Sequence, residues 1–336
     1  MIGADRLGLT PHSGIKLELQ GKIPQEADLE PRVGPRYAPP MALVDVVVVS
    51  YNSAAHLRDC VAPLASMEGT NVIVVDNASA DGSLRTVADL PLTAIQRAEN
   101  AGFAAGCNEG WRAGEGRYVL FLNPDAALDG HSLNALVAAL QADESLGAVA
   151  PRIERPDGSL AWSQRRFPRL RSSYARALFL HRLFPRVSWA DELIRDVRAY
   201  EKLSNPEWVS GACLLVRRSA LEEIGGWDDG FFLYGEDIDF CRRLRERGYT
   251  LLFEPSARAM HAEGASAPRS DTLPLLVASR LRYDSKHRGR AAVALDRVAI
   301  ALNALTHMVV SRGGKASRAG HARALRVALR PASGRR

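Results

Sequence analysis

The stretch VDVVVV at residues 44–49 constrains the fold more than any other part of the chain, because it is a run of valines interrupted by a single Asp. Such a strand is typical of a parallel sheet that helices cover on both faces. Strand and helix then alternate, which predicts an α/β fold with a mainly parallel sheet, and Ser53 is the expected N-cap of the first helix. Apolar runs continue at 72–75, 92–98 and 117–122, and helical patterns lie at 54–67 and 100–114.

Polar side chains follow three of these strands at the point where each strand ends. They are Ser50, Tyr51 and Asn52, then Asp76 and Asn77, then Asn123 and Asp125. Open α/β sheets bind ligands at the carboxyl ends of their strands, so we expect these side chains to line one crevice. Each cluster alone is also an ordinary turn sequence, and the presence of three clusters at one edge is what favours a binding site.

The chain lacks the two common glycine motifs that hold nucleotide phosphates, G-x-G-x-x-G after the first strand and G-x-x-x-x-G-K-[ST]. Gly102, Gly106 and Gly110 have helical spacing instead, which predicts close packing of a helix. A nucleotide in this crevice would need another group to neutralise its phosphates. A divalent cation held by Asp125 would do so.

Residues 209–249 predict a strand, a helix, a loop and a second helix that begins inside an acidic cluster, Glu236, Asp237 and Asp239. Acids at a helix N-terminus are stabilised by the unpaired N–H groups and by the helix dipole. The cluster alone therefore has an ordinary structural explanation. A catalytic role needs support from the rest of the chain.

Six motifs in order supply that support: VVVVSYN, VVDNASADGS, NAGFAAGCNEG, YVLFLNPDAAL, VSGACLLVRRSALEEIGGWDDGFFLYGEDIDFCRRLRERGY and EPSARAMH. With these motifs the chain resembles family 2 glycosyltransferases, which are inverting enzymes with the nucleotide-diphospho-sugar-binding GT-A fold. The likeness covers about residues 44–265 and looks closest to the rhamnosyltransferase-like branch, which builds bacterial surface polysaccharides and cell-wall linkers.

The resemblance implies a role for each matching residue. Asp237 would be the catalytic base, and Asp125 and His261 would bind Mg²⁺ or Mn²⁺, with Asn123 standing where the family's metal motif has its first acid. The base and ribose of the donor would lie on Tyr51, Asn52, Asp76 and Asn77, and the remaining donor-side residues are Ser50, Asn100, Gly102, Asn108 and Asn123. The acceptor side would contain Trp208, Gly211, Trp227, Glu236, Asp239 and Arg243.

The resemblance also implies the substrates. The expected donor is a nucleotide-diphospho-sugar, dTDP-L-rhamnose first, with UDP-galactofuranose or another UDP-hexose as the alternative. The expected acceptor is a polyprenyl-linked or oligosaccharide chain. The rival interpretation is a non-catalytic GT-A protein whose basic tail binds nucleic acid. Because the chain keeps Asp125 and Asp237, the sequence favours an enzyme.

The domain organisation follows from composition. Residues 1–40 are rich in proline and are expected to be a disordered extension, and residues 41–265 form the transferase, with a donor half at 41–150 and an acceptor half at 151–265. Residues 266–336 are expected to be basic amphipathic helices. From 280 onward the chain has fourteen lysines and arginines against two acids, although the net charge of the whole chain is only +6.

The basic tail favours an anionic membrane surface as partner, with no nucleic acid expected. Residues 291–310 are long enough to span a bilayer, but Asp296, Arg297, Asn303 and His307 predict an amphipathic helix instead. An apolar stripe at Ala322, Leu325 and Leu329 predicts a second amphipathic helix that lies in a membrane interface. The four separated cysteines are typical of a reducing compartment. Together these features predict a cytoplasmic enzyme, peripheral on the inner face of the cell membrane.

Arginines alternate with aromatic residues between 152 and 190, where the regular alternation of strand and helix is interrupted. This mixture is found at lipid interfaces and nucleic-acid sites. It is equally compatible with solvated helix faces, whose long side chains cover apolar surface. The sequence leaves the three alternatives open.

Overall fold

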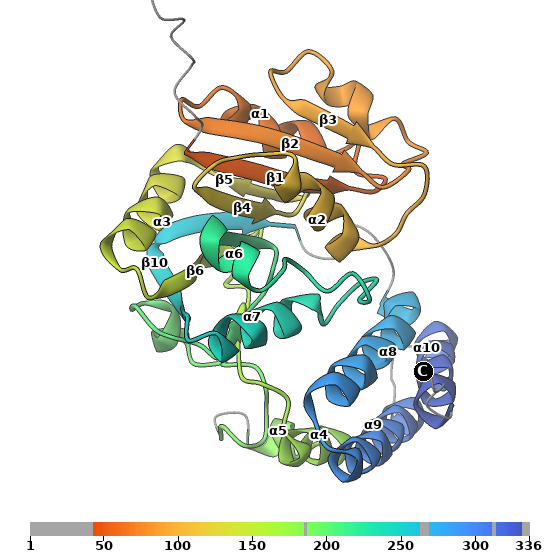
Figure 1. Ribbon diagram of the computed structural model, residues 1–336. Coiled ribbons are helices and arrows are strands. Elements are labelled where there is room, and N and C mark those ends of the chain that lie inside the picture. Colours follow the sequence, from red (N-terminus) through yellow and green to blue (C-terminus); the bar gives the residue numbers. More distant parts are fainter. Residues whose placement is uncertain (1–42, 185–186, 263–268, 311–313, 331–336) are drawn as a thin grey trace, which may run out of the picture. The chain divides into compact units, whose positions relative to one another are not determined.

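The computed structural model describes residues 43–184, 187–262, 269–310 and 314–330 (Figure 1). The extension predicted to be disordered lies outside the described residues, and so does the predicted domain boundary at 265. The described chain from residue 43 belongs to one compact unit, which extends from Pro40 to Arg336.

An eight-stranded sheet forms the centre, in the order β3-β2-β1-β4-β9-β6-β10-β5. The pairs β1–β2, β1–β4, β2–β3 and β6–β10 are parallel, whereas β9 lies antiparallel between β4 and β6, and β5 is antiparallel to the end of β10. The predicted α/β fold with a mainly parallel sheet is therefore confirmed. The strands are β1 Val44–Ser50, β2 Thr70–Asp76, β3 Thr93–Gln96, β4 Tyr118–Leu122, β5 Ala126–Leu128, β6 Leu146–Glu154, β9 Cys213–Arg217 and β10 Thr250–His261.

Helices cover both faces of this sheet, as the valine run predicted. Val46 and Val48 pack in the core under α1 and α3, whereas Val47 and Val49 pack in the core under α2, α6 and α7. The helices are α1 Leu57–Ala65, α2 Phe103–Arg112, α3 Gly130–Ala142, α6 Arg218–Glu223 and α7 Glu236–Glu246, with a 3₁₀ turn, η1, at Ser83–Val87.

The glycines of α2 allow this helix to lie directly on β1. A Cβ atom at Gly106 would lie 2.7 Å from the Val49 side chain, and one at Gly110 would collide with Val47. The prediction of close helix packing is confirmed. The predicted N-cap is wrong: α1 begins at Leu57, and Ser53 contributes only its backbone carbonyl, which accepts the Leu57 N–H at 2.9 Å.

The segment between β6 and β9 forms a small layer of its own. It contains the two-stranded sheet β7 Gln164–Arg165 and β8 Trp208–Val209, the helices α4 Leu170–Ala177 and α5 Leu180–Leu183, and the 3₁₀ turn η2 Val197–Tyr200. The C-terminal helices are α8 Arg269–His287, α9 Arg290–Val310 and α10 Gly314–Leu329. They pack on one another, and α9 lies along α4 while α8 reaches α7 (Figure 1).

Candidate active site

Hydrogen bonds join the loops that follow β1 and β2. The Asn52 N–H donates to Ser79 Oγ at 2.9 Å, and the Ala80 N–H donates to Asn52 Oδ1 at the same distance. The Asp76 carboxylate in turn accepts the Ser79 hydroxyl and N–H. Asn52 and Ala78 have positive φ, a backbone strain that often persists at ligand sites. These loops give the predicted donor crevice a rigid edge.

Two buried polar atoms without a partner among the described residues lie where β1 and β2 end. Within the described chain, Ser50 Oγ and Asn77 Oδ1 are buried without a hydrogen-bond partner, although Asn77 Nδ2 donates to the Gly102 carbonyl at 3.0 Å. The neighbouring Tyr51 side chain is exposed. A buried polar atom without a partner is unfavourable by about 1–3 kcal/mol, so these atoms favour a polar ligand at this place.

The N-terminus of α2 forms the next wall. Gly102 precedes the helix with φ of 94°, its N–H donates to Asn100 Oδ1 at 3.0 Å, and the Phe103 N–H donates to the Phe232 carbonyl at 3.0 Å. A Cβ at Gly102 would collide with the Phe232 backbone. Glycine therefore allows the loop before α7 to close against α2.

Asn108 braces the same loop from inside α2. Its Nδ2 donates to the Trp227 carbonyl at 2.8 Å, and its Oδ1 accepts the Trp227 N–H and the Trp111 indole N–H. Asn108 is predicted to lie near the donor, but its buried side chain is engaged with the protein in this structure. Its effect on the crevice acts through the loop that it holds.

Asp125 and His261 meet although 136 positions separate them. His261 Nε2 lies 3.1 Å from Asp125 Oδ1 and 3.2 Å from Asn123 Nδ2, because β10 ends opposite Ala126. Burial raises the pKa of Asp125, but the interaction with His261 outweighs it, so the pKa lies below its ordinary value. An imidazole nitrogen and a carboxylate at this distance need a proton or a cation between them.

Oxygen and imidazole donors fit Mg²⁺ or Mn²⁺. No group of three or more His, Cys, Asp or Glu side chains gathers for a metal in the residues that the structure describes. Among the described residues the pair would therefore need further ligands, from a substrate and water, to hold a cation. Such a partial shell is usual for cations that bind phosphates.

Asp237 of α7 lies beside the turn that precedes β9. The Asn123 N–H donates to the Ala212 carbonyl at 2.9 Å, and a Cβ at the neighbouring Gly211 would lie 3.5 Å from the Cβ of Asp237. Asp237 therefore stands at the junction of β4 and β9. Its side chain is only partly buried, so a ligand can reach it.

Burial and neighbouring charges change the pKa values of the two adjacent acids, Glu236 and Asp237. Burial and then the charge of Asp237 raise the pKa of Glu236 to about 8. Burial also raises the pKa of Asp237, but the charge of Arg165 and the Gly211 N–H oppose that increase. Arg165 and the Gly211 N–H therefore favour the charged form of Asp237, which is the form that accepts a proton.

The predicted acceptor-side residues separate into two groups. Trp208 and Trp227 join Gly211 and Glu236 near Asp237: the Trp208 ring lies under the Arg165 guanidinium at 5.0 Å, and Trp227 stacks on Phe240. The Trp227 indole N–H and Glu236 Oε2 are buried and lack a protein partner among the described residues. All four residues are buried, Trp208 and Trp227 belong to the hydrophobic core, and the Trp208 indole N–H donates to the Arg166 carbonyl at 2.9 Å, so their acceptor role stays a prediction.

Asp239 and Arg243 face α8 and not Asp237. Asp239 is fully buried, and its carboxylate lies 2.7 Å from Arg243 of the same helix and 2.7 Å from both Lys286 and His287 of α8. The structure thus places these two residues in the packing of α7 on α8. Sequence reasoning, in contrast, did not single out Arg165, which faces the base, because its only signal was its place in the arginine-rich stretch.

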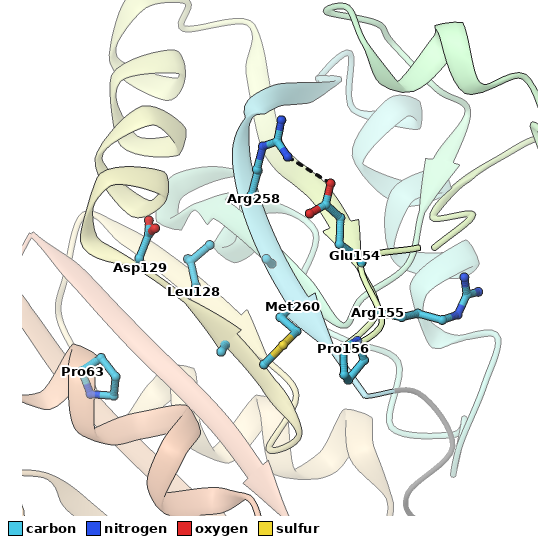
Figure 2. Close-up of a pocket in the computed structure, with 11 residues that line it drawn as sticks. Pro63, Leu128, Asp129, Glu154, Arg155, Pro156, Arg258 and Met260 are labelled. Atoms are coloured by element: carbon cyan, nitrogen blue, oxygen red, sulfur yellow. Dashed lines mark hydrogen bonds and ion pairs between the residues drawn. The ribbon is translucent and has the colours of Figure 1, made fainter. Parts of the chain in front are cut away.

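A pocket of about 410 Å³ lies beside the edge strand β5 (Figure 2). Leu128, Met260 and Pro156 form much of its wall, and Arg258, paired with Glu154 at 3.1 Å, stands at its side. Met260 immediately precedes His261 in the sequence. None of the predicted site residues lines this pocket, so it is separate from the donor crevice.

Comparison with solved structures identifies the class of fold. The chain resembles a mannosyltransferase from Pyrobaculum calidifontis in complex with GDP-Man and Mn²⁺, with a TM-score of 0.52 over 86% of each chain and 18% sequence identity. The fold is therefore the GT-A glycosyltransferase fold.

Sequence comparison then identifies the family. The profile of glycosyl transferase family 2 matches residues 45–225. An N-acetylglucosaminyl-diphospho-decaprenol L-rhamnosyltransferase of Mycobacterium tuberculosis is 31% identical over 263 residues, which cover 72% of this chain and 83% of that protein. The rhamnosyltransferase WbbL of Escherichia coli is 29% identical over 157 residues, 46% of this chain and 55% of its own. The chain belongs to glycosyl transferase family 2, and the expectation of an enzyme is confirmed.

Proposed function

We propose that this chain is an inverting rhamnosyltransferase that moves L-rhamnose from dTDP-L-rhamnose to a polyprenyl-diphosphate-linked sugar in the synthesis of a cell-envelope glycan. Two observations support the chemistry: the position of Asp237 at the β4–β9 junction and the contact between Asp125 and His261. The choice of substrates is supported by the name of the mycobacterial relative.

Asp237 would accept the proton of the acceptor hydroxyl as its oxygen attacks the anomeric carbon. A new C–O bond forms on one face of the sugar while the bond to the diphosphate breaks on the other, so the configuration is inverted. The nucleoside diphosphate departs with the bonding electrons.

Asp125 and His261 would hold a divalent cation together with the donor diphosphate. When bound, the cation would neutralise the charge on the leaving group as a Lewis acid. Asn123 contributes an amide where the family motif has an acid, so this protein would supply one negative charge fewer to the site. Ser50, Asn77 and Tyr51 would then contact the nucleoside, since they offer unpaired or exposed groups in the same crevice.

A polyprenyl-linked acceptor remains in a bilayer, so the enzyme would act at the inner face of the membrane as a peripheral protein. Nucleic acid is not an expected substrate or partner. UDP-galactofuranose or another UDP-hexose remains the alternative donor, because none of the groups in the crevice selects between thymine and uracil by itself.

The test is Asp237→Asn, which keeps the size of the side chain but cannot accept the proton. We expect kcat to fall by about 10²- to 10⁴-fold while the dissociation constant of the donor changes little. Glu246→Gln, an exposed residue on the same helix, is the matched control and should behave as wild type. Nucleotide release is measured with dTDP-L-rhamnose, UDP-galactofuranose and UDP-glucose. Wild-type turnover by the Asp237 variant would exclude it as the base.

A further inference from the structure

Helix α9 presents apolar side chains to solvent. Leu295, Val298, Leu305 and Val309 are 51%, 57%, 44% and 71% exposed, and their spacing of three, seven and four residues places them on one stripe. We refer to these four residues as the α9 stripe. In a helix that packs on a soluble core, such a stripe would face inward.

The polar side chains of α9 face inward instead. Asp296 is fully buried and lies 2.7 Å from Arg280 and 3.3 Å from Arg288, and Thr306 Oγ1 donates to the Ala177 carbonyl at 2.9 Å. These contacts attach α9 to α8 and α4. They fix the rotation of the helix and leave the α9 stripe uncovered among the described residues.

Exposed apolar residues adjoin the C-terminal half of α9. Leu178, Leu183 and Phe184 are exposed around α5, and the ring of Phe179, which precedes α5, lies 4.4 Å from that of His307 in α9. Exposed apolar residues are therefore found at α5 as well as on α9.

The surroundings of the stripe are cationic. Asp296 is the single acid in α9 and α10, and it is buried. Lys315, Arg318 and Arg326 of α10 are exposed, as is Arg330, which follows α10, and the exposed Asp271 of α8 pairs with Arg323 of α10 at 2.6 Å. An apolar stripe on a helix that packs on this cationic helix matches an anionic bilayer, into whose interface the stripe can insert while the cations meet lipid phosphates. Duplex nucleic acid would satisfy the cations but leave the stripe in water.

Length and composition also allow α9 to be considered as a membrane span, and among the described residues it is the one helix that passes this test. Spanning would require Asp296 to leave Arg280 and Arg288 and enter hydrocarbon, which is strongly unfavourable. Lying in the interface requires no such change. The contacts of α9 therefore favour the interfacial position.

We propose that the α9 stripe is the surface by which this enzyme lies on an anionic bilayer, with α9 parallel to the membrane plane. The inference rests on the proposed function in one respect, because an enzyme with a lipid-linked acceptor must reach that acceptor at a membrane surface. Binding itself needs no turnover and can be measured separately.

The experiment is co-sedimentation of the full chain with vesicles of phosphatidylcholine alone or with 30% phosphatidylglycerol. We expect binding to the anionic vesicles, partly retained in 0.5 M NaCl because apolar insertion is not screened by salt. Val298→Glu with Leu305→Glu should reduce the partition coefficient by about tenfold or more. Val197→Glu with Leu203→Glu replaces two apolar residues of similar exposure outside α8–α10 and should leave binding unchanged.

Unchanged vesicle binding by the α9 double variant, with its melting temperature preserved, would overturn the proposal. Tighter binding to duplex DNA than to anionic vesicles at the same salt would also overturn it, as would a dimer in solution that the double variant converts to a monomer. Nucleotide release with a water-soluble acceptor separates the two proposals. If that activity is present but vesicle binding is absent, only the membrane surface is wrong. If vesicles bind but no nucleotide-sugar is turned over, the proposed function is wrong.

Discussion

Replacing Asp239 by Asn tests whether this acid belongs to the substrate site or to the packing of α7 on α8. The substitution keeps the shape of the side chain and removes its charge. In the wild type the carboxylate is fully buried, and Arg243, Lys286 and His287 all lie 2.7 Å away. The variant would leave these groups with one anion fewer in a buried environment.

The expected loss of stability is large. Breaking one side of a buried ion pair destabilises a protein by about 3–5 kcal/mol. Lys286 keeps Asp228 at 2.7 Å, and Arg243 keeps the Ile224 carbonyl at 2.7 Å, so the lower end of that range applies. For a chain of 336 residues, whose entropy of unfolding is about 0.7 kcal/mol/K, a loss of about 3 kcal/mol corresponds to a melting temperature lower by roughly 4 °C.

The loss should also depend on pH in a defined direction. Burial raises the pKa of Asp239, but its bonds to His287, Lys286 and Arg243 outweigh burial and hold the pKa well below the ordinary value. A depressed pKa contributes stability that is complete above the unfolded pKa of about 4 and is lost as the pH falls through the folded pKa. The difference in melting temperature should thus shrink as the pH falls below about 4.

Calorimetry from pH 3 to pH 8 measures the stability, and transfer assays well below the melting temperature measure the function. Glu246→Gln is the control, because its carboxylate pairs with Arg242 on the surface of the same helix and is expected to contribute less than about 1 kcal/mol. We expect the acceptor KM of the Asp239 variant to stay near the wild-type value. A wild-type melting temperature combined with a raised acceptor KM would refute the packing argument and return Asp239 to the acceptor site.

Two further predictions concern the site. Arg165→Gln removes the charge that opposes the raised pKa of Asp237, so the acidic limb of the plot of kcat against pH should move to higher pH. Arg166 contacts backbone carbonyls, so the control Arg166→Gln should leave the acidic limb at the wild-type pH. An unchanged acidic limb in the Arg165 variant would show that Arg165 does not act on the base. EDTA should abolish transfer, and calorimetric donor titrations in Mn²⁺ should show weaker binding for Asp125→Ala and a milder loss for His261→Ala. Full activity in chelator would remove the cation from the mechanism.

Local patterns were enough to predict the sheet and the helices that cover it. The valine run and the glycines of α2 describe packing on immediate neighbours, so each had one physical solution. The meeting of Asp125 and His261 could not be read from spacing, because it depends on β10 ending against β5. Only the resemblance to the family suggested that pair.

The remaining features depend on long-range contacts that have no local signal. Asp239 occupies an ordinary position in the first turn of a helix. No residue near it in the sequence indicates that its partners Lys286 and His287 will come from α8. The apolar stripe of α9 is visible in the sequence, but periodicity does not say which side faces solvent. The buried pair of Asp296 with Arg280 decides that, and the two residues lie in different helices.

The position of β9 between β4 and β6 has a consequence for the segment that joins β6 to β9. The chain leaves the sheet after Glu154 and returns at Cys213, and both points are fixed by strand pairing with the catalytic core. The segment between these two points contains both Arg165, whose charge acts on Asp237, and Ala177, whose carbonyl accepts the Thr306 hydroxyl of α9. Replacing this segment would therefore change the surroundings of the proposed base and the support of α9 together.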